Sequence, residues 1–430
     1  MTITFVGHGY VGLVTAAIFA DLGNKVWVIG HTAEKVENLK KGIIPIYEPG
    51  LEEVVRRNVK AKRLLFTLDY SPAIAESKIV FIAVGTPPLP SGEADLSVVF
   101  DVAEKVGKNL DDYTVVVVKS TVPIGTNYRV QELIEKVKPG EAHFDVASVP
   151  EFLREGQALS DTLHPDRNVI GTDTVEARDV LLELHKSIDG PKVLTNVRTA
   201  EMIKYAANAF LATKISFANA IAQLSEETGA DGIKALEAVG LDKRIGRSFL
   251  SPGAGYGGSC FPKDVKAIIA IAKSHGYDFK LLKDAEEINK QAMERMVSKA
   301  VSILGGSVKG KMITVLGLSF KPDTDDMRDA PSVFVINKLI EKGAKIKTYD
   351  PIAMENAKKI MKDITFTKDA YDAVTDSELV IVMTEWNEFK ELNLEKVKKL
   401  MKSLAILDGR NIYEPQKIKD LGFSYVGVGR

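Results

Sequence analysis

The stretch Thr2-Ile3-Thr4-Phe5-Val6 leads directly into Gly7-His8-Gly9-Tyr10-Val11-Gly12. Residues 13–22 then read as a helix, Gly23-Asn24 as its end, and residues 25–29 as a second strand. Strand, G-x-G-x-x-G, helix and strand in this order form the context that a dinucleotide-binding turn requires. The glycines allow a tight turn and the close approach of a pyrophosphate, which the N-terminus of the helix attracts. The sequence therefore predicts a dinucleotide site on this turn.

The end of the second strand departs from the usual pattern. An acidic residue commonly stands there and binds the ribose hydroxyls, but this chain has Gly30, followed by His31, Thr32 and Lys35. Two interpretations are open. In the first, Thr32 is only the N-cap of the next helix and Lys35 is solvated. In the second, a pocket without a carboxylate receives the 2′-phosphate of NADP through His31, Thr32 and Lys35.

The alternation of strands and helices continues through the first half of the chain. Buried strands are predicted at residues 78–84, 113–119 and 144–149, with shorter ones at 168–171 and 192–194. In a parallel sheet the carboxyl ends of the strands face the ligand crevice. The residues placed there are Gly85, Thr86, Thr121, Glu151 and Glu155.

Residues 199–228 contain neither proline nor glycine and predict one long helix. The segment is apolar nearly all round, so we expect it to be buried between domains. Lys204 and Asn208 lie four residues apart and share a face of this helix. A helical lysine is usually solvated, but one in line with buried positions needs a partner, which favours a functional role.

The only cysteine, Cys260, follows a run in which four of six residues are glycine, at positions 253, 255, 257 and 258. A helix is predicted directly after it, with Lys263 and Asp264 at its start. A lone cysteine is most often a small buried hydrophobe. A glycine loop, a helix N-terminus, a cation and a carboxylate together favour a thiolate nucleophile instead.

A second α/β unit is predicted after Gly305-Gly306, with strands at residues 312–316, 345–349, 379–383 and 405–407 and a helix at 331–342. Before it, residues 265–303 predict two helices joined near Gly276. This half has no G-x-G-x-x-G, so it need not hold a second dinucleotide. Its loops carry Lys321, Arg328 and Arg410, which suit a phosphorylated ligand, although an exposed basic loop is the commoner meaning.

Composition restricts the class of protein. The chain has 430 residues, 45% apolar and 27% charged, with a net charge of −1, which is typical of a globular protein of two or three domains. The near-zero charge gives no sign of nucleic-acid binding or of a membrane anchor. One cysteine excludes an intrachain disulfide, and no Cys/His cluster suggests a metal site. With no signal peptide and no long apolar run, we expect a reducing cytoplasm.

Motifs spread over nearly the whole chain carry a family resemblance. They are Gly7-His8-Gly9-Tyr10-Val11-Gly12-Leu13, Gly85-Thr86-Pro87, Ser120-Thr121-Val122-Pro123, Pro150-Glu151-Phe152-Leu153-Arg154-Glu155-Gly156 and Phe320-Lys321-Pro322. The most specific runs from Asp242-Lys243-Arg244-Ile245-Gly246 through Phe249-Leu250 into Gly255-Tyr256-Gly257-Gly258-Ser259-Cys260-Phe261-Pro262-Lys263-Asp264. On these motifs the chain resembles the UDP-glucose/GDP-mannose dehydrogenase family, and its cysteine loop resembles the UDP-glucose branch. Gly30 departs from the family pattern, in which an acidic residue is expected.

The resemblance implies an architecture and a reaction. The fold would be two Rossmann-like doubly wound α/β domains, joined by a long central helix and a small helical dimerisation region. The parts would be residues 1–197, 198–304 and 305–430, in a homodimer or a larger assembly of dimers. The reaction would be oxidation of the C6 alcohol of UDP-glucose to UDP-glucuronate with two NAD and no metal, through a thiohemiacetal and a thioester on Cys260.

The resemblance also assigns roles. Lys204 and Asn208 would stabilise the oxyanion, Asp264 and Thr121 would hold the catalytic water, and Glu151 would be the acid/base of thioester hydrolysis. The residues expected at the cofactor are Gly7, Gly9, Tyr10, Val11, Gly12, Gly30, His31, Thr32, Lys35, Gly85, Thr86, Thr121, Glu155, Lys263 and Arg328. Those expected at the nucleotide sugar are Glu151, Phe152, Leu153, Glu155, Lys204, Asn208, Arg244 (from a neighbouring subunit), Phe249, Leu250, Gly253, Tyr256, Gly257, Phe320, Lys321 and Arg410.

Two alternatives stand beside this reading. One is a dehydrogenase of another nucleotide sugar, such as GDP-mannose or a UDP-N-acetylhexosamine. The other is a non-catalytic binder of nucleotide sugars. Cys260, Lys204 and Asp264 together favour an enzyme, because a binder has no need of that set. A β-hydroxyacid dehydrogenase would share the first domain and the long helix, but it needs neither the cysteine nor the second α/β domain.

Overall fold

The computed structural model describes all 430 residues, which form two compact units. Unit 1 consists of residues 1–207 with 266–271, and unit 2 of residues 208–265 with 272–430. The boundary falls inside two helices, α9 (Val197–Thr228) and α11 (Phe261–Ser274). None of the helices combines the length and the hydropathy that a membrane span requires.

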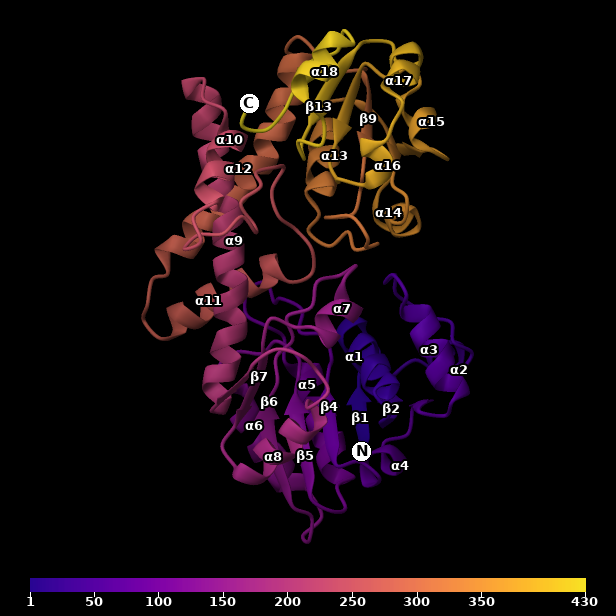
Figure 1. Cartoon of the computed structure of the whole chain (residues 1–430), viewed down its shortest axis with the longest axis vertical. Coiled ribbons are helices and arrows are strands. Elements are labelled where there is room, and N and C mark those ends of the chain that lie inside the picture. Colours follow the sequence, from indigo (N-terminus) through magenta and orange to yellow (C-terminus); the bar gives the residue numbers. More distant parts are fainter. The chain divides into compact units, whose positions relative to one another are not determined.

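An eight-stranded sheet forms the centre of unit 1, in the order β3-β2-β1-β4-β5-β6-β7-β8 (Figure 1). From β3 to β6 this is the strand order of a dinucleotide-binding fold. The strands are parallel except that β7 runs antiparallel to β6, which the prediction of a parallel sheet did not foresee. The strands are β1 (Thr2–Val6), β2 (Lys25–Ile29), β3 (Leu64–Thr67), β4 (Ile79–Ile82), β5 (Thr114–Val118), β6 (Phe144–Ser148), β7 (Asn168–Thr172) and β8 (Lys192–Thr195).

Helices cover both faces of this sheet, because its central strands are apolar on both sides. In β4, Ile79 and Phe81 join one buried cluster, while Val80 and Ile82 join another. The first cluster contains α1, α3 and α8, and the second contains α5 and α6. The helices of unit 1 are α1 (Tyr10–Asp21), α2 (Ala33–Lys40), α3 (Leu51–Lys60), α4 (Ser71–Ala75), α5 (Ser97–Lys108), α6 (Thr126–Val137), α7 (Ala158–Leu163) and α8 (Val175–Leu184).

Unit 2 repeats the same strand order in a six-stranded sheet, β11-β10-β9-β12-β13-β14. Its strands are β9 (Met312–Leu316), β10 (Lys345–Tyr349), β11 (Ile364–Phe366), β12 (Leu379–Val382), β13 (Ala405–Asp408) and β14 (Ser424–Val426). Its further helices are α10 (Gly232–Gly240), α12 (Lys280–Ile303), α13 (Pro331–Glu341), α14 (Met354–Ile360), α15 (Ala370–Val374), α16 (Asn387–Lys390), α17 (Leu394–Leu400) and α18 (Pro415–Asp420). The second Rossmann-like domain is therefore confirmed.

The crevice of the second sheet is occupied by one of its own side chains. Asp350 follows β10, is fully buried, and takes the place where a dinucleotide fold carries its ribose-binding acid. One carboxylate oxygen accepts hydrogen bonds from the amide of Leu318 (2.7 Å) and from the indole of Trp386 (3.1 Å). The other accepts from the amides of Ile352 and Ala353 (2.9 and 2.8 Å). The chain's own donors thus saturate this carboxylate, in agreement with the lack of a second G-x-G-x-x-G.

Helix α9 is a single helix of 32 residues, as predicted, but it is not buried on every side. In unit 2, Phe210, Phe217 and Leu224 are 66%, 51% and 59% exposed. The expectation that the helix is covered all round is therefore wrong for these positions. Their spacing of seven residues places them in one row along the helix.

Candidate active site

The turn after β1 has the form of a phosphate cradle. Gly7 has a φ of +116°, and a Cβ there would lie 2.2 Å from the carbonyl oxygen of Ala83. A Cβ on Gly9, by contrast, would meet nothing within 4 Å, so this side of the turn is open. Helix α1 begins at Tyr10 without a side-chain cap, which leaves the amides of its first turn for an anion. The predicted residues of this turn therefore fit the pyrophosphate of a dinucleotide.

The loops after β4 and β5 meet at the same edge of the sheet. The hydroxyl of Thr86 donates a hydrogen bond of 3.0 Å to the carbonyl oxygen of Thr121. Ser120, the neighbour of Thr121, accepts the amide of Val84 at 2.9 Å. The structure thus brings together Gly85, Thr86 and Thr121, as the parallel strand order predicts.

The end of β2 is shaped differently from an ordinary ribose site. His31 and Lys35 are exposed, and Thr32 precedes α2 without capping it through its side chain. A Cβ on Gly30 would lie 2.5 Å from Cγ2 of Val36 and 3.2 Å from Nδ1 of His8. An acidic residue therefore does not fit at position 30 unless Val36 moves. His8, inside the G-x-G-x-x-G motif, was not among the predicted site residues.

Tyr10 is engaged by a residue that the sequence analysis missed. Its hydroxyl donates a hydrogen bond to the carboxylate of Glu48, which is almost fully buried. Glu48 also accepts the amides of Gly156 and Ala158 at 2.6 and 2.7 Å. Glu48 thereby holds the segment that carries Glu155 at the beginning of α7. Nothing in the sequence around Glu48 distinguishes it from the many exposed glutamates.

A buried ion pair stands after β6. Nζ of Lys204 lies 2.9 Å from Oε1 of Glu151, with only 5% and 7% of these side chains exposed. Burial opposes the ionisation of Glu151, but Lys204, the amide of Leu153 and Lys119 outweigh it and hold the pKa of this carboxyl below its ordinary value. The partner that a buried Lys204 requires is therefore Glu151.

Lys119, a second buried lysine at this site, was not predicted. It follows directly on the apolar strand β5, and its Nζ lies 3.4 Å from the carbonyl oxygen of Val149. Burial, together with the charge of Lys204, lowers the pKa of the Lys119 ammonium group to about 8. The charge of Glu151 opposes this shift. A charged residue directly after a run of four valines is the sequence signal that could have revealed it. Nearby, Phe152 lies under Lys204, whose Nζ is 5.4 Å from the centroid of its ring.

Cys260 immediately precedes α11, as predicted. Its sulfur lies 3.5 Å from the hydroxyl of Ser259, and its carbonyl oxygen accepts the amide of Asp264 at 2.9 Å. The residue is partly buried, and it stands where the partial positive charge of the helix N-terminus favours a thiolate.

Asp264 links the cysteine helix to α9. It is 1% exposed, and its two oxygens accept hydrogen bonds of 2.5 Å from Nδ2 of Asn208 and from Nζ of Lys263. Unit 2 therefore brings together Cys260, Lys263, Asp264 and Asn208. Helix α9 places Lys204 one turn before Asn208 on the same face, so one helix serves both clusters.

The loop before the cysteine is held by aromatic contacts and by one asparagine. Phe249 has a φ of +63°, a conformation that non-glycine residues rarely adopt. The ring of Phe261 lies 6.0 Å from the rings of both Phe249 and Tyr256, in edge-on contact. Asn289 of α12 accepts the amide of Tyr256 (2.7 Å) and donates to its carbonyl (3.1 Å). Asn289 is a further residue that the sequence analysis missed.

Arg410, on the loop after β13, joins the other predicted substrate residues of unit 2. Its guanidinium donates to the carbonyl oxygens of Met383 (2.8 Å), Phe320 (3.2 Å) and Gly255 (3.4 Å). A Cβ on Gly253 would lie 3.2 Å from Nη1 of Arg410, so the loop approaches this arginine closely.

The remaining predicted residues of unit 2 lie as follows. A Cβ on Gly257 would lie 2.2 Å from the carbonyl oxygen of Asp329, and Lys321 places its ammonium 5.7 Å from the ring centroid of Phe320. Leu250 is buried, and Arg328 pairs with Asp326 at 2.7 Å. Arg244 stands apart, since its side chain is 89% exposed and pairs with Asp242.

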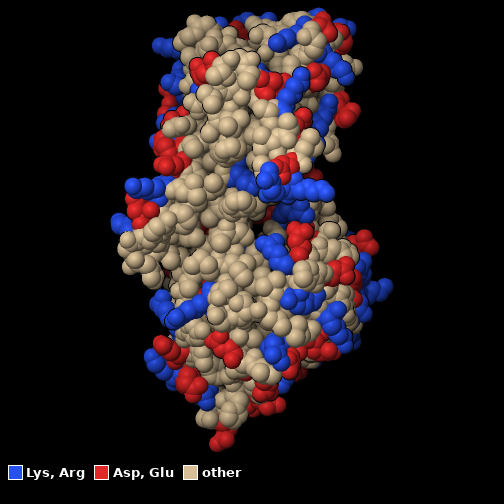
Figure 2. Space-filling view, turned by 60° about the vertical axis from the view of Figure 1, so that its left-hand side comes forward, with Lys and Arg blue, Asp and Glu red and all other residues tan.

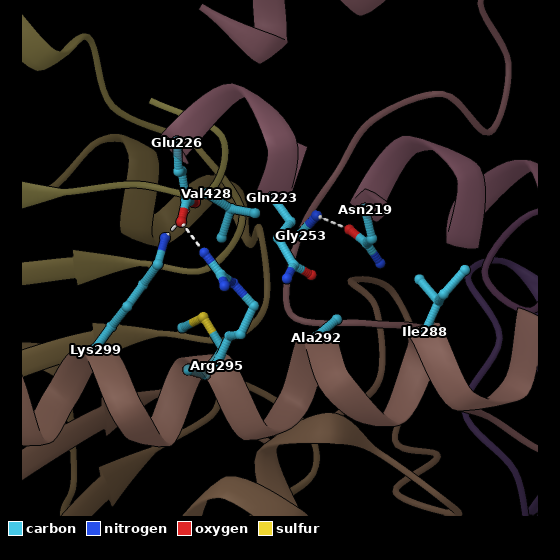
Figure 3. Close-up of a pocket in the computed structure, with 10 residues that line it drawn as sticks. Asn219, Gln223, Glu226, Gly253, Ile288, Ala292, Arg295, Lys299 and Val428 are labelled. Atoms are coloured by element: carbon cyan, nitrogen blue, oxygen red, sulfur yellow. Dashed lines mark hydrogen bonds and ion pairs between the residues drawn. The ribbon is translucent and has the colours of Figure 1, made fainter. Parts of the chain in front are cut away.

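Unit 2 also contains a small cavity of about 20 Å³ between α9 and α12 (Figure 3). The carboxylate of Glu226 accepts hydrogen bonds there from Arg295 (2.6 Å), Lys299 (2.5 Å) and the amide of Gly429 (2.7 Å). This ion cluster fastens the C-terminal residues to both helices. Oδ1 of Asn219 accepts the amide of Gly253 at 2.8 Å, so the cavity adjoins the glycine loop that precedes Cys260.

Comparison with known proteins agrees with the geometry. The chain matches the UDP-glucose/GDP-mannose dehydrogenase family in its NAD binding domain (residues 1–189), central domain (198–291) and UDP binding domain (314–415). UDP-glucose 6-dehydrogenase TuaD of Bacillus subtilis is 48% identical, over 100% of this chain and 93% of that protein. UDP-glucose 6-dehydrogenase of Rhizobium meliloti is 45% identical over 100% of both.

Solved structures resemble this one over nearly the whole chain. A UDP-glucose dehydrogenase from Pyrobaculum islandicum superposes with a TM-score of 0.93 at 40% identity, covering 99% of this chain and 97% of that one. A UDP-D-ManNAc dehydrogenase from Pyrococcus horikoshii has a TM-score of 0.88 at 28% identity, covering 100% and 99%.

The buried pair predicts a pH-dependent stability change. Lys204→Met should lower the free energy of unfolding at pH 8 by about 3 kcal/mol, because the carboxylate of Glu151 stays buried with one partner fewer. The deficit should shrink toward pH 5, since a poorly paired buried carboxyl has a raised pKa and becomes neutral. In the unmodified protein the pKa of Glu151 is lowered, so its stabilisation is present above the unfolded pKa of about 4.3 and is lost as the pH falls below that value.

Denaturant unfolding at pH 5 and pH 8 measures both effects. Lys60→Met, on the exposed end of α3, is the matched control and should change neither value. A deficit for Lys204→Met that is equal at the two pH values would contradict the role of Glu151.

Proposed function

This chain belongs to the UDP-glucose/GDP-mannose dehydrogenase family, and on that premise we propose that it oxidises UDP-glucose to UDP-glucuronate in two successive two-electron steps. The observation that carries the proposal is Cys260 at the N-terminus of α11, beside an Asp264 that Asn208 and Lys263 hold. Bound at the turn after β1, NAD would supply the hydride acceptor for both oxidations. Water supplies the second oxygen of the carboxylate.

Cys260 would act as the nucleophile. Its thiolate adds to the C6 aldehyde that the first oxidation leaves, which forms a C–S bond and an oxyanion, the thiohemiacetal. The second oxidation converts this adduct to a thioester. Water then adds to the thioester carbon and the C–S bond breaks, which releases the carboxylate and returns the thiol.

Six side chains would stabilise the charges and transfer the protons of these steps. Lys204 and Asn208 would donate to the oxyanion, and each such donor is worth roughly 10²–10³ in rate. Glu151, whose pKa is lowered, would be ready to accept the proton of the attacking water. Asp264 would hold that water together with Thr121. Lys119 would raise the positive potential at Glu151 further.

The nucleotide part of the substrate would lie on the loops of unit 2. Lys321 and Arg410 supply positive charge for a diphosphate, and the loop 249–257 supplies backbone groups and the ring of Tyr256. We propose the same roles for Phe320, Gly253 and Gly257, and for Arg244 if a second subunit approaches. Residues 1–197, 198–304 and 305–430 would be the functional parts.

A reducing compartment such as the cytoplasm suits this mechanism, because the nucleophile must remain a free thiol.

Helix α9 supports a homodimer. The row Phe210, Phe217 and Leu224 is exposed at seven-residue spacing, which is the pattern of a seam between helices. Figure 2 shows an area free of charged side chains over the helical part of unit 2. An apolar row of this kind favours a second copy of the chain, since a like helix offers the same spacing. A larger assembly of such dimers is compatible with this contact.

The cofactor proposal is dual use. A carboxylate at position 30 would accept the ribose hydroxyls of NAD and repel the 2′-phosphate of NADP, and Gly30 does neither. The loss of these hydrogen bonds corresponds to an affinity for NAD that is about ten- to a hundredfold weaker. We therefore propose that discrimination between the two cofactors is weak, with NAD accepted and NADP used at least measurably.

The first prediction here concerns the nucleophile. Cys260→Ser should lower NADH formation from UDP-glucose at least about a thousandfold, because a serine hydroxyl remains protonated and its ester turns over slowly. Calorimetry should show unchanged binding of UDP-glucose. Ser259→Ala, one residue away, should keep the activity. Near-normal formation of UDP-glucuronate by Cys260→Ser would rule out the covalent mechanism. The identity of the substrate is tested separately: a preference of the unmodified enzyme for GDP-mannose or UDP-N-acetylmannosamine over UDP-glucose would favour another substrate.

The second prediction concerns assembly. Phe217→Glu combined with Leu224→Glu should convert the dimer to a monomer, because each change buries a charge in the apolar row. Sedimentation velocity measures the outcome. Val175→Glu, an equally exposed apolar position on α8, is the control and should leave the dimer intact. A fully active monomer of the unmodified chain would refute the proposed interface.

The third prediction concerns the cofactor ratio. The unmodified protein should show kcat/KM values for NAD and NADP within about a hundredfold of each other. Gly30→Asp alone should fit poorly against Val36, so the informative variant is Gly30→Asp with Val36→Ala, which should improve NAD and penalise NADP. Rejection of NADP by a thousandfold or more in the unmodified protein would show that Gly30 is a neutral substitution.

A further inference from the structure

His8, the second residue of the turn after β1, carries a buried polar atom without a partner. The residue is 4% exposed, and its Nδ1 has no hydrogen-bond partner. Buried ring nitrogens are normally satisfied, so an unsatisfied one requires an explanation. The direction of Nδ1 offers an explanation. This nitrogen lies 3.2 Å from the position that a Cβ on residue 30 would take. The imidazole thus faces the space that an acidic side chain would enter in an ordinary NAD site.

Basic groups surround this space. The ring of His31 lies 4.9 Å from that of His8, and the positive charges of His31 and Lys35 both lower the pKa of His8. The acidic residue in the first turn of α2 is Glu34, which is exposed. A bound anion would therefore be flanked by His8, His31 and Lys35.

The first turn of α2 adds donors on the same side. Its first intrahelical hydrogen bond runs from the amide of Val36 to the carbonyl oxygen of Thr32, at 3.1 Å. The amides of residues 33–35 precede that bond and are left for another acceptor. The hydroxyl of Thr32 does not cap the helix. Helix dipole, amides and hydroxyl all favour an anion at this point.

We propose that His8 is the specificity-determining residue for the cofactor, and that its imidazole, with His31, receives the 2′-phosphate of NADP over the bare Gly30. The inference rests on the proposed dual use of cofactors and names the group that produces it. NAD, which has no 2′-phosphate, would leave Nδ1 unpartnered.

The proposal has a signature in protons. Burial, then the charges of His31 and Lys35, lower the pKa of His8, so its ring is neutral at pH 7.5 when no ligand is bound. A phosphate dianion beside it favours the imidazolium form. Binding of NADP should therefore take up a proton, and its Kd should rise as the pH goes from 6.5 to 8.5. The Kd of NAD should stay flat. The second pKa of a phosphate, about 6, lies below this range.

The test uses binding and not only activity. Isothermal titration of NADP and NAD into the whole protein, at pH 7.5 in two buffers of different ionisation enthalpy, gives the Kd and the number of protons taken up. His8→Phe keeps an aromatic ring of similar size and should weaken NADP about tenfold, abolish its proton uptake, and change NAD less than twofold. His8→Asn keeps a donor near the place of Nδ1, so it should retain part of the NADP affinity without the pH slope. His164→Gln, an exposed histidine on the loop after α7, is the control.

The outcomes separate the two proposals. If the unmodified protein binds NADP but His8→Phe leaves its Kd and proton uptake unchanged, the role of His8 is overturned while dual use stands. If NAD binds and NADP does not, both fall. If NADP binds with proton uptake that only the His8 variants remove, the role of His8 is supported.

Discussion

A buried charge must have a partner, and this constraint arranges the functional groups of both units. Lys204 can leave water only because Glu151 meets it at 2.9 Å, and Glu151 stays ionised only because Lys204, Lys119 and a backbone amide surround it. Asp264 is likewise buried, and it accepts hydrogen bonds from Asn208 and Lys263. Helix α9 supplies one residue to each arrangement, Lys204 to the first and Asn208 to the second.

Much of the fold follows from the order of apolar runs and glycines. β2, β9 and β10 occupy the predicted residues, and the long helix differs from its prediction by two residues at one end. Central parallel strands are apolar on both faces, which makes them conspicuous. The edge strands β3, β11 and β14 were missed because they are short and half-exposed, so their composition resembles that of loops. The antiparallel pairing of β7 with β6 depends on a chain reversal that no local pattern encodes.

Some residues of the site could be predicted from their neighbours in the sequence, and others could not. Cys260 at a helix N-terminus, the open Gly9 and the strand-end threonines are consequences of neighbouring residues, and the structure has them as expected. Glu48, Lys119 and Asn289 act across 30 or more residues of sequence, on Gly156, Val149 and Tyr256. His8 is inside the quoted motif, but the position that its Nδ1 faces belongs to Gly30, which follows another strand. Sequence reasoning finds chemistry carried by adjacent residues and misses chemistry created by contact.

Asp350 shows how one architecture can serve two purposes within a chain. The two sheets share a strand order, yet the first keeps an open cradle at its switch point, whereas the second fills the equivalent point with a carboxylate held by four donors named above. The Asp350 carboxylate therefore accepts the hydrogen bonds that a bound ligand would otherwise accept. The amides of the turn after β9 find their acceptor within the chain, so this domain needs no bound phosphate to satisfy them. Removing the carboxylate of Asp350 would leave these buried donors without an acceptor.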